Sequence, residues 1–500
     1  MAGGSLGDRY GRIKTIAIGA AWGIFGASLQ CSAQNHVWMI FGMSLRAYIV
    51  AVLMADNRVK ARLINGWGTG ILNAIVPVWA TETAEHTSRG QFVSIEFTLN
   101  ILGVVVAYWL EFACSYYGDG SGNYGFVWRF PIAFQIIPLI LLLVIVWFFP
   151  ESPRWLAKVG RNEEARYILG RLRGETGVDA GKAEAEFQDI INIAELERKT
   201  SKSNSYYAML FGIGQGKLHT ARRVQLVIWL QIFQEWIGIA GVTIYAPEIF
   251  RLSGIGVAKA KWISGLNYIT YTFATLICVF TLDRIGRRWT LYWGSVMQGL
   301  SMILAGAFTI IGQDAIAAGN TARAASFGIG AVAMIFIFTA TFGATWLTVP
   351  WLYPAEIFPL EVRAKGNAWG VVGWSIGNGW CTLLLPSIFN RLHQNTYFIF
   401  GAVNVITIPI VWALYPESNQ RTLEEMNLLF AADSIWNWEA ERNFAILKEQ
   451  NPELVQAARR GNSVVDPETG LTHRGGSVGR KPSLDATALE LGEKRTVQHN

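Results

Sequence analysis

The chain has 500 residues, of which 52% are hydrophobic and only 16% are charged. Soluble domains carry about 25% charged residues, so this composition excludes an ordinary soluble protein. The apolar residues come in runs of about 20, the length that crosses a bilayer as a helix. The net charge of +6 does not indicate nucleic-acid binding, because the basic residues gather at the ends of these runs and set topology. We therefore expect an all-α membrane protein.

Ten apolar runs predict membrane spans in chain order. The long polar stretch at 154–223 holds 13 Lys and Arg against 9 Asp and Glu, which places it in the cytoplasm by the positive-inside rule. Alternation of the spans then places the C-terminus there too. The spans fall at about 15–34, 62–81, 91–112, 130–149, 224–246, 262–282, 289–311, 327–349, 367–389 and 397–415.

These spans divide the chain into four parts. We expect an N-terminal membrane half at 1–150, a linker of short amphipathic helices at 151–222, a C-terminal membrane half at 223–416 and a cytoplasmic tail at 417–500. The tail is expected to begin with a helix in the stretch "DSIWNWEAERNFAILKEQ" at 433–450 and to end in a Gly/Ser/Thr/Lys-rich disordered segment. Four single cysteines show neither metal nor disulfide spacing.

Residues 43–61 interrupt the apolar pattern. They place Arg46, Asp56, Arg58 and Lys60 beside a span, where each intramembrane charge costs a few kcal/mol. Without them, the flanking residues join into one continuous apolar helix. We interpret the stretch as a retained intron, which sequencing of the transcripts tests: spliced messages that keep these codons would reject it.

Three charged motifs occur twice in the same order, at offsets of 275, 274 and 266 residues. "GGSLGDRYGRIK" matches "TLDRIGRRWT", "PVWATETAEHTSRG" matches "WLYPAEIFPLEVRAKG", and "PESPRWL" matches "PESNQRTL". Ordered offsets of this kind indicate an internal duplication of about half the chain.

Together these motifs resemble those of the sugar porters of the major facilitator superfamily, most closely the fungal hexose-type carriers. The resemblance runs from Gly3 to about Phe430. It implies two pseudo-symmetric six-helix halves, with the first helix and most of the second missing, because Met1 is followed at once by the first motif. No cofactor, metal or nucleic-acid partner is expected. The protein is expected to be a monomer in the plasma membrane.

The resemblance also implies a cytoplasmic gating network at the inner ends of the helices. Carboxylates there can pair with arginine forks and cap helix N-termini, and such pairs can bias a rigid-body rocking motion. The alternative is that these charges only fix topology. The first set is Asp8, Arg9, Arg12, Glu82, Arg89, Glu151 and Arg154, and the second is Asp283, Arg284, Arg287, Glu356, Arg363, Glu417 and Arg421.

The substrate is expected near the midplane between the halves. On the stretch "LQIFQEWIGIAGVTIYAPEIF", Gln234 matches the family's first glutamine, Glu235 replaces the second, and Ala240 stands where sugar carriers usually have Asn. For the glutamines, hydrogen bonding between helices is the alternative role. The substrate-binding candidates are Gln231, Gln234, Glu235, Tyr245, Trp346, Trp374 and Asn378.

Ionisable residues within spans are functional candidates. Arg62 matches an arginine that partners an acid in proton-coupled members, and Glu96 and Glu235 could carry a proton or act as neutral hydrogen-bonding acids. The predicted function is transport of a hexose or related sugar or polyol by alternating access, either as a proton symporter or as a uniporter. The alternative is a carrier-like sensor that signals through its tail. We do not expect an enzyme, because the sequence shows no cluster of residues typical of a catalytic site.

Overall fold

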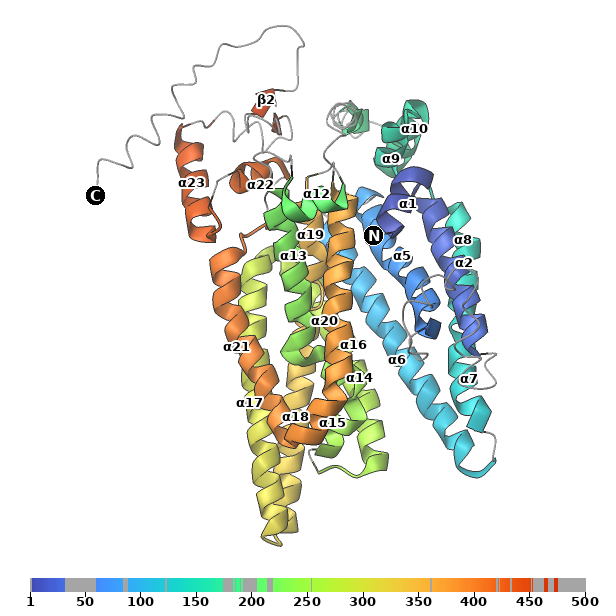
Figure 1. Cartoon of the computed structure of the whole chain (residues 1–500), viewed down its shortest axis with the longest axis vertical. Helices are drawn as coiled ribbons and strands as arrows, with labels where there is room; N and C mark the ends of the chain where they lie inside the picture. Colours follow the sequence, from blue (N-terminus) through green and yellow to red (C-terminus); the bar gives the residue numbers. More distant parts are fainter. Residues whose placement is uncertain are drawn as a thin grey trace, which may run out of the picture.

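The apolar runs fold into long helices that stand side by side in the computed structural model (Figure 1). Apart from short segments, the molecule is helical throughout the residues that the structure describes. These residues are 2–31, 60–83, 89–121, 124–173, 183–184, 186–188, 190–191, 205–213, 219–252, 254–359, 362–419, 421, 423–431, 434–450, 452, 463–465 and 472–474.

The first bundle comes from the N-terminal part of the chain. In it α2 packs against α5 and α8, and α6 packs against α7. Its elements are α1 (Ala2–Tyr10), α2 (Arg12–Cys31), α5 (Lys60–Thr83), α6 (Arg89–Ser121), α7 (Tyr124–Phe134), α8 (Ile136–Ile145) and the 3-10 turn Val146–Phe148.

The second bundle contains the larger buried core, in which α17 packs against α18 and α21, and α13 against α20. Its elements are α13 (Thr220–Gln234), a π turn (Glu235–Ile239), α14 (Ala240–Ile244), α15 (Ala246–Leu252), α16 (Val257–Ile285), α17 (Arg287–Ala317), α18 (Thr321–Ala344), α19 (Val349–Ile357), α20 (Arg363–Leu392), the 3-10 turn His393–Asn395 and α21 (Thr396–Leu414).

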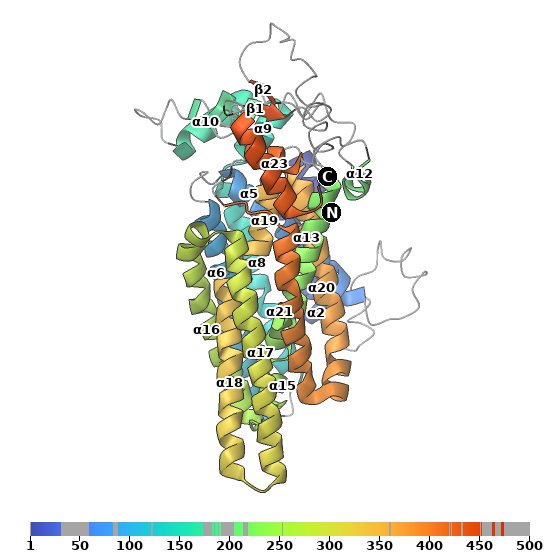
Figure 2. The same cartoon turned by 90° about the vertical axis from the view of Figure 1, so that its left-hand side faces the viewer.

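Short elements gather at one end of both bundles, which we call the linker end (Figures 1 and 2). The expected linker helices and tail helix are present there, whereas the expected disordered tail lies outside the described residues except for Pro452 and one antiparallel strand pair. The elements are α9 (Pro153–Val159), α10 (Asn162–Arg173), α12 (Tyr206–Phe211), α22 (Leu423–Phe430), α23 (Asn437–Gln450), β1 (Ser463–Val465) and β2 (Thr472–Arg474).

Where their residues are described, the ten expected spans fall on helical structure, and seven stretches of the described residues are long and apolar enough to cross a membrane. α2 and α5 are not among the seven; α5 includes charged and amide side chains. Residues 43–59 of the proposed insertion lie outside the described residues. The seven stretches are Gln91–Tyr116, Gly125–Phe148, Thr220–Ile244, Val257–Ile285, Arg287–Ala317, Thr321–Ile357 and Lys365–Leu414, the last of which combines two expected spans.

Two expected spans are broken rather than continuous. The span at 224–246 is interrupted by the π turn, where Gly238 has a φ of 120° and packs against Phe400. The Asn404 Nδ2 donates to the Ile237 carbonyl at 2.9 Å, so side chains from α21 stabilise the break. In the expected span at 327–349, helix α18 ends at Ala344. A proline follows at position 350, and proline lacks the N–H that a continuing helix requires.

The two bundles meet along α6 and α16. The hydroxyl of Thr275 donates to that of Thr98 at 2.9 Å. A Cβ atom on Gly265 would lie 2.7 Å from the Trp109 ring, so the glycine permits this close approach. A second contact joins α20 to α1 and α5, and the bundles therefore touch on two sides.

Candidate functional site

The first charged network closes the linker end of the N-terminal bundle. The guanidinium of Arg12 donates to both carboxylate oxygens of Glu82 at 2.9 Å and to Asp8 at 3.4 Å. The carboxylate of Glu151 accepts the backbone N–H groups of Arg12 at 2.9 Å and Ile13 at 3.2 Å. Glu151 therefore caps the N-terminus of α2, where unpaired N–H groups favour an anion.

The second network repeats this geometry in the C-terminal bundle. Arg287 donates to Glu356 at 2.6 Å and pairs with Asp283 at 3.0 Å. Glu417 accepts the backbone N–H groups of Arg287 at 2.9 Å and Arg288 at 3.0 Å. The two motif sets thus occupy equivalent positions, as the internal duplication predicts.

A glycine with positive φ makes room for each capping carboxylate. Gly11 has a φ of +96°, and a Cβ there would lie 2.5 Å from a carboxylate oxygen of Glu151. Gly286 has a φ of +94°, and its Cβ would lie 2.9 Å from Glu417. Only glycine meets both requirements without strain.

Replacing Gly286 by alanine should lower the melting temperature of the protein. Alanine at positive φ costs on the order of 1–3 kcal/mol, and here its Cβ would also displace the Glu417 carboxylate. Gly254→Ala is the matched control, because its φ is +84° but no atom lies within 4 Å of the added Cβ. Thermal unfolding should rank Gly286→Ala below the control; equal melting would show that the contact with Glu417 contributes nothing.

The ion pairs of Arg12 and Arg287 each join residues of the same bundle, so they stiffen each half. Arg421 forms a bidentate pair with Glu441 of α23 at 2.7 and 2.9 Å. Arg154 lies close enough to Glu82 to act on its charge. Of the other members, Arg9 and Arg284 are exposed, Arg363 is buried, and the side chain of Arg89 lies outside the described residues.

Glu82 lies just beyond the expected span at 62–81, and its side chain is 9% exposed. Burial alone would raise the pKa of this carboxyl, but the charge and hydrogen bonds of Arg12 outweigh burial and hold the pKa below its usual value. Because the pKa is lower in the folded state, the pair stabilises the fold above the unfolded pKa. That contribution is lost as the pH falls through the folded value.

The two glutamines of α13 are buried and hold the break between α18 and α19. Gln231 Nε2 donates to the Pro350 carbonyl at 3.1 Å. Gln234 Nε2 donates to the carbonyls of Trp346 and Leu347 at 2.8 and 3.0 Å. Among the described residues neither Oε1 atom has a partner. The glutamines therefore bond between helices and each keep an acceptor oxygen for a further donor.

Glu235 begins the π turn and is buried, with its side chain within hydrogen-bonding reach of Trp374. Tyr245, at the end of α14, donates to the Thr382 carbonyl at 3.3 Å. Asn378 accepts from the Thr382 hydroxyl at 2.9 Å. Glu235 and Tyr245 thus both have polar contacts with α20.

Trp346 is fully buried rather than open to a cavity. Its indole N–H lies 3.1 Å from both the Leu291 carbonyl and the Ser295 hydroxyl of α17. In this conformation the ring is part of the core of the C-terminal bundle. Its proposed contact with a sugar ring would require the α18–α19 break to move.

An aromatic row made of Phe97, Trp351 and Trp374 crosses between the two bundles. The ring of Trp351 lies 5.6 Å from Phe97 on α6 and 5.9 Å from Trp374 on α20, measured between centroids. Phe97 and the bridging role of Trp351 were not predicted. The chain has 21 Trp and 27 Phe, so single aromatic residues do not stand out in the sequence. Their positions beside Glu96 and Pro350 were the available cues.

The structure describes the side chains of two of the three proton-coupling candidates, Glu96 and Glu235. Glu96 lies beside Phe97 on α6, half-buried, with no partner for its Oε2 among the described residues. Asn100, one turn further on, is exposed. Arg62 belongs to α5, but its side chain lies outside the described residues.

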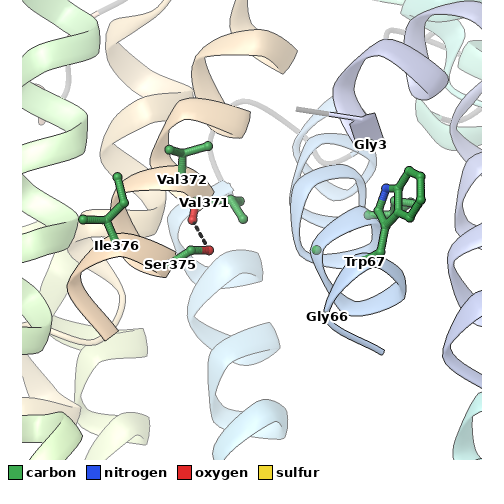
Figure 3. Close-up of a pocket in the computed structure, with 9 residues that line it drawn as sticks. Gly3, Gly66, Trp67, Val371, Val372, Ser375 and Ile376 are labelled. Carbon is green, nitrogen blue, oxygen red and sulfur yellow. Dashed lines mark hydrogen bonds between the residues drawn. The ribbon is translucent and has the colours of Figure 1, made fainter. Parts of the chain in front are cut away.

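A pocket of about 440 Å³ opens between the bundles on the other side of α20 (Figure 3). Its walls are mainly apolar. The Ser375 hydroxyl and the indole N–H of Trp67 are the side-chain groups in its lining that can form hydrogen bonds. The Ser375 Oγ donates to the Val371 carbonyl at 2.8 Å. The lining residues are Gly3, Gly66, Trp67, Gly70, Ile71, Val371, Val372, Ser375 and Ile376.

Comparisons with known proteins agree with this arrangement. The model of the family described as "Sugar (and other) transporter" matches residues 1–430. The sugar transporter STL1 of Saccharomyces cerevisiae is 28% identical over 426 residues, which cover 85% of this chain and 68% of that protein. The arabinose-proton symporter of Bacillus subtilis is 28% identical over 436 residues, covering 85% of this chain and 82% of that one.

The fold is likewise that of solved transporters. The structure of the proton:xylose symporter XylE bound to 6-bromo-6-deoxy-D-glucose superposes with a TM-score of 0.68 at 25% identity, covering 86% of this chain and 85% of that one. Two helical bundles joined by a helical linker are the architecture of the major facilitator superfamily. The chain therefore belongs to the sugar (and other) transporter family.

Proposed function

We propose that this protein carries a hexose or a related sugar or polyol across a membrane by alternating access. The family match over residues 1–430 is the observation that supports this most strongly. The buried amides of α13, the aromatic row and the interbundle pocket supply the groups that a neutral polyol requires. The relatives reported above are named as transporters rather than as sensors.

The charged networks fit this function as stiffeners and gates. Each network holds its own bundle rigid, so the bundles can rock against each other along α6 and α16. Contacts between the two linker-end networks would form and break as the carrier changes state. We place the linker end in the cytoplasm and the carrier in the plasma membrane as a monomer.

Uptake of a labelled sugar panel by a host that lacks its own sugar carriers tests the function. Cells expressing the chain should accumulate at least one sugar, and uptake at two external pH values separates symport from uniport. Signalling without uptake would favour the sensor, and conversion of the sugar by purified protein would favour an enzyme.

Gln234→Ala tests the substrate site. The lost amide removes hydrogen bonds worth about 0.5–1.5 kcal/mol each, so the KM for uptake should rise roughly 2- to 10-fold. Gln298→Ala is the control, because Gln298 is also buried and bonds the same helix break through the Thr345 hydroxyl at 3.2 Å. An unchanged KM in Gln234→Ala, or the same rise in both variants, would count against substrate contact.

A further inference from the structure

A proline deprives one carbonyl of α14 of its usual helical partner. In a continuous helix the Thr243 carbonyl would accept the N–H of the residue four positions on. That residue is Pro247, which has no N–H to donate. The hydroxyl of Tyr268, on α16, donates to the Thr243 carbonyl instead. The Tyr268 side chain is buried, at 4% exposed, so it replaces the missing helical bond from inside the bundle.

The segment that carries this carbonyl is the second half of a broken helix. It comprises α14 and α15 at residues 240–252, which we call the half-helix. It follows the π turn, where Gly238 has a φ of 120°, and it lies in the part of the bundle away from the linker end (Figure 1). Tyr397, on α21, donates to the Ile249 carbonyl of the half-helix at 2.9 Å. Tyrosine hydroxyls from α16 and α21 thus both hold the half-helix in its present position.

Tyr268 also contacts the other bundle. The centroid of its ring lies 4.9 Å from that of Tyr108 on α6, and the two rings are tilted by 50°. The hydroxyl of Tyr108 donates to the Lys261 carbonyl of α16 at 2.8 Å, and the adjacent Trp109 packs over Gly265. The N-terminal bundle therefore touches α16 at the place where Tyr268 reaches the half-helix.

We propose that Tyr268 is a positioning residue through which contact between the bundles fixes the half-helix. This rests on the proposed function, because transport by alternating access requires the bundles to rock against each other. While α6 lies against α16, the Tyr108 ring confines the Tyr268 ring, and the Tyr268 hydroxyl holds the Thr243 carbonyl. When the bundles separate here, Tyr268 is released and the half-helix can turn about the π turn at Gly238.

The bond from Tyr268 to the Thr243 carbonyl is the stronger of the two links. Leaving a buried carbonyl unpaired costs more than losing one aromatic contact, so the ring pair separates first. The half-helix then moves together with the Tyr268 side chain. Tyr245, a substrate-binding candidate, lies between α14 and α15. The position of the bundles would therefore change what this tyrosine offers to a substrate.

Hydrogen–deuterium exchange of the backbone amides at 240–252, in the purified full chain, tests the coupling. Tyr268→Phe removes the hydroxyl and should speed this exchange roughly fivefold. Tyr108→Ala removes the ring on α6 and should speed it about threefold. The double variant should exchange no faster than Tyr268→Phe alone, because Tyr108 acts on the half-helix through Tyr268.

Tyr397→Phe is the matched control, because it also removes one hydroxyl that holds a carbonyl of the half-helix. Its helix, α21, packs against α17 within the C-terminal bundle. In the double variant of Tyr397→Phe with Tyr108→Ala, the two increases in exchange should therefore multiply. Multiplying increases for Tyr108→Ala with Tyr268→Phe, or unchanged exchange in Tyr108→Ala, would overturn the proposal.

The conservative variant Tyr108→Phe separates positioning from a general loss of packing. It keeps the ring and should match the unaltered protein both in exchange at 240–252 and in the KM for sugar uptake. Tyr108→Ala should raise that KM roughly threefold, and the same KM in both variants would count against the proposal. Exchange requires no transport, whereas counterflow by the unaltered protein tests transport alone, so the failure of either idea can be told from the failure of the other.

Discussion

Replacing Arg12 by methionine should lower the free energy of unfolding by about 3–5 kcal/mol. The Arg12 and Glu82 side chains are only 5% and 9% exposed, and two hydrogen bonds of 2.9 Å join them. Loss of the guanidinium leaves the Glu82 carboxylate buried without its principal partner, which costs more than the pair itself contributes. Denaturant titration of the purified protein measures the change.

Three further variants separate this effect from a general loss of charge. Arg9→Met should unfold like the unaltered protein, because Arg9 is exposed. Arg287→Met should cost less than Arg12→Met, since the Glu356 side chain is 21% exposed. The double change Arg12→Met with Glu82→Leu should recover much of the loss. Unaltered stability in Arg12→Met would contradict the account of this network.

Replacing Glu235 by glutamine should abolish sugar accumulation driven by a pH gradient while leaving downhill uptake in place. Glutamine keeps the shape of the side chain within the π turn but cannot bind and release a proton. For one proton per sugar, a gradient of one pH unit supports roughly tenfold accumulation. The variant should therefore equilibrate the sugar without concentrating it, as measured by its internal and external concentrations.

Glu96→Gln is the informative comparison, because Glu96 is the other acid beside the aromatic row. Glu111→Gln serves as the control, since Glu111 is exposed near the far end of α6. If Glu96→Gln alone loses accumulation, the proton is carried on α6 instead. Full accumulation in both variants would remove these carboxyls from the coupling step.

The arrangement of spans could be predicted from the sequence because runs of apolar residues are a strong local signal. The π turn after α13 could not, since it depends on contacts from another helix, whereas the break before α19 lies beside Pro350, which is a local cue. The π turn at Glu235 is held by Asn404 and Phe400 from α21, more than 160 residues away. Local propensity carries no information about such partners.

The charged part of the candidate site could be predicted from the sequence, because its motifs are local. The contacts that these residues make with other helices could not. The duplicated motifs predicted carboxylates that pair with arginines and cap helices. Glu82 and Glu356 make the pairs, and Glu151 and Glu417 cap α2 and α17. The pairing of Arg421 with α23 was not foreseen, because the motif alone does not show which helix lies beside it. Trp346 was predicted to contact the substrate. Its ring is buried in this conformation, and the contact with a sugar stays a prediction.

Sugar counterflow in proteoliposomes of the purified chain tests transport most directly. Vesicles loaded with unlabelled sugar should transiently concentrate the labelled sugar from outside, and an imposed inward proton gradient should then raise accumulation in a manner that depends on Glu235. Counterflow no greater than in protein-free vesicles, for every sugar in the panel, would contradict the account of the chain as a sugar carrier.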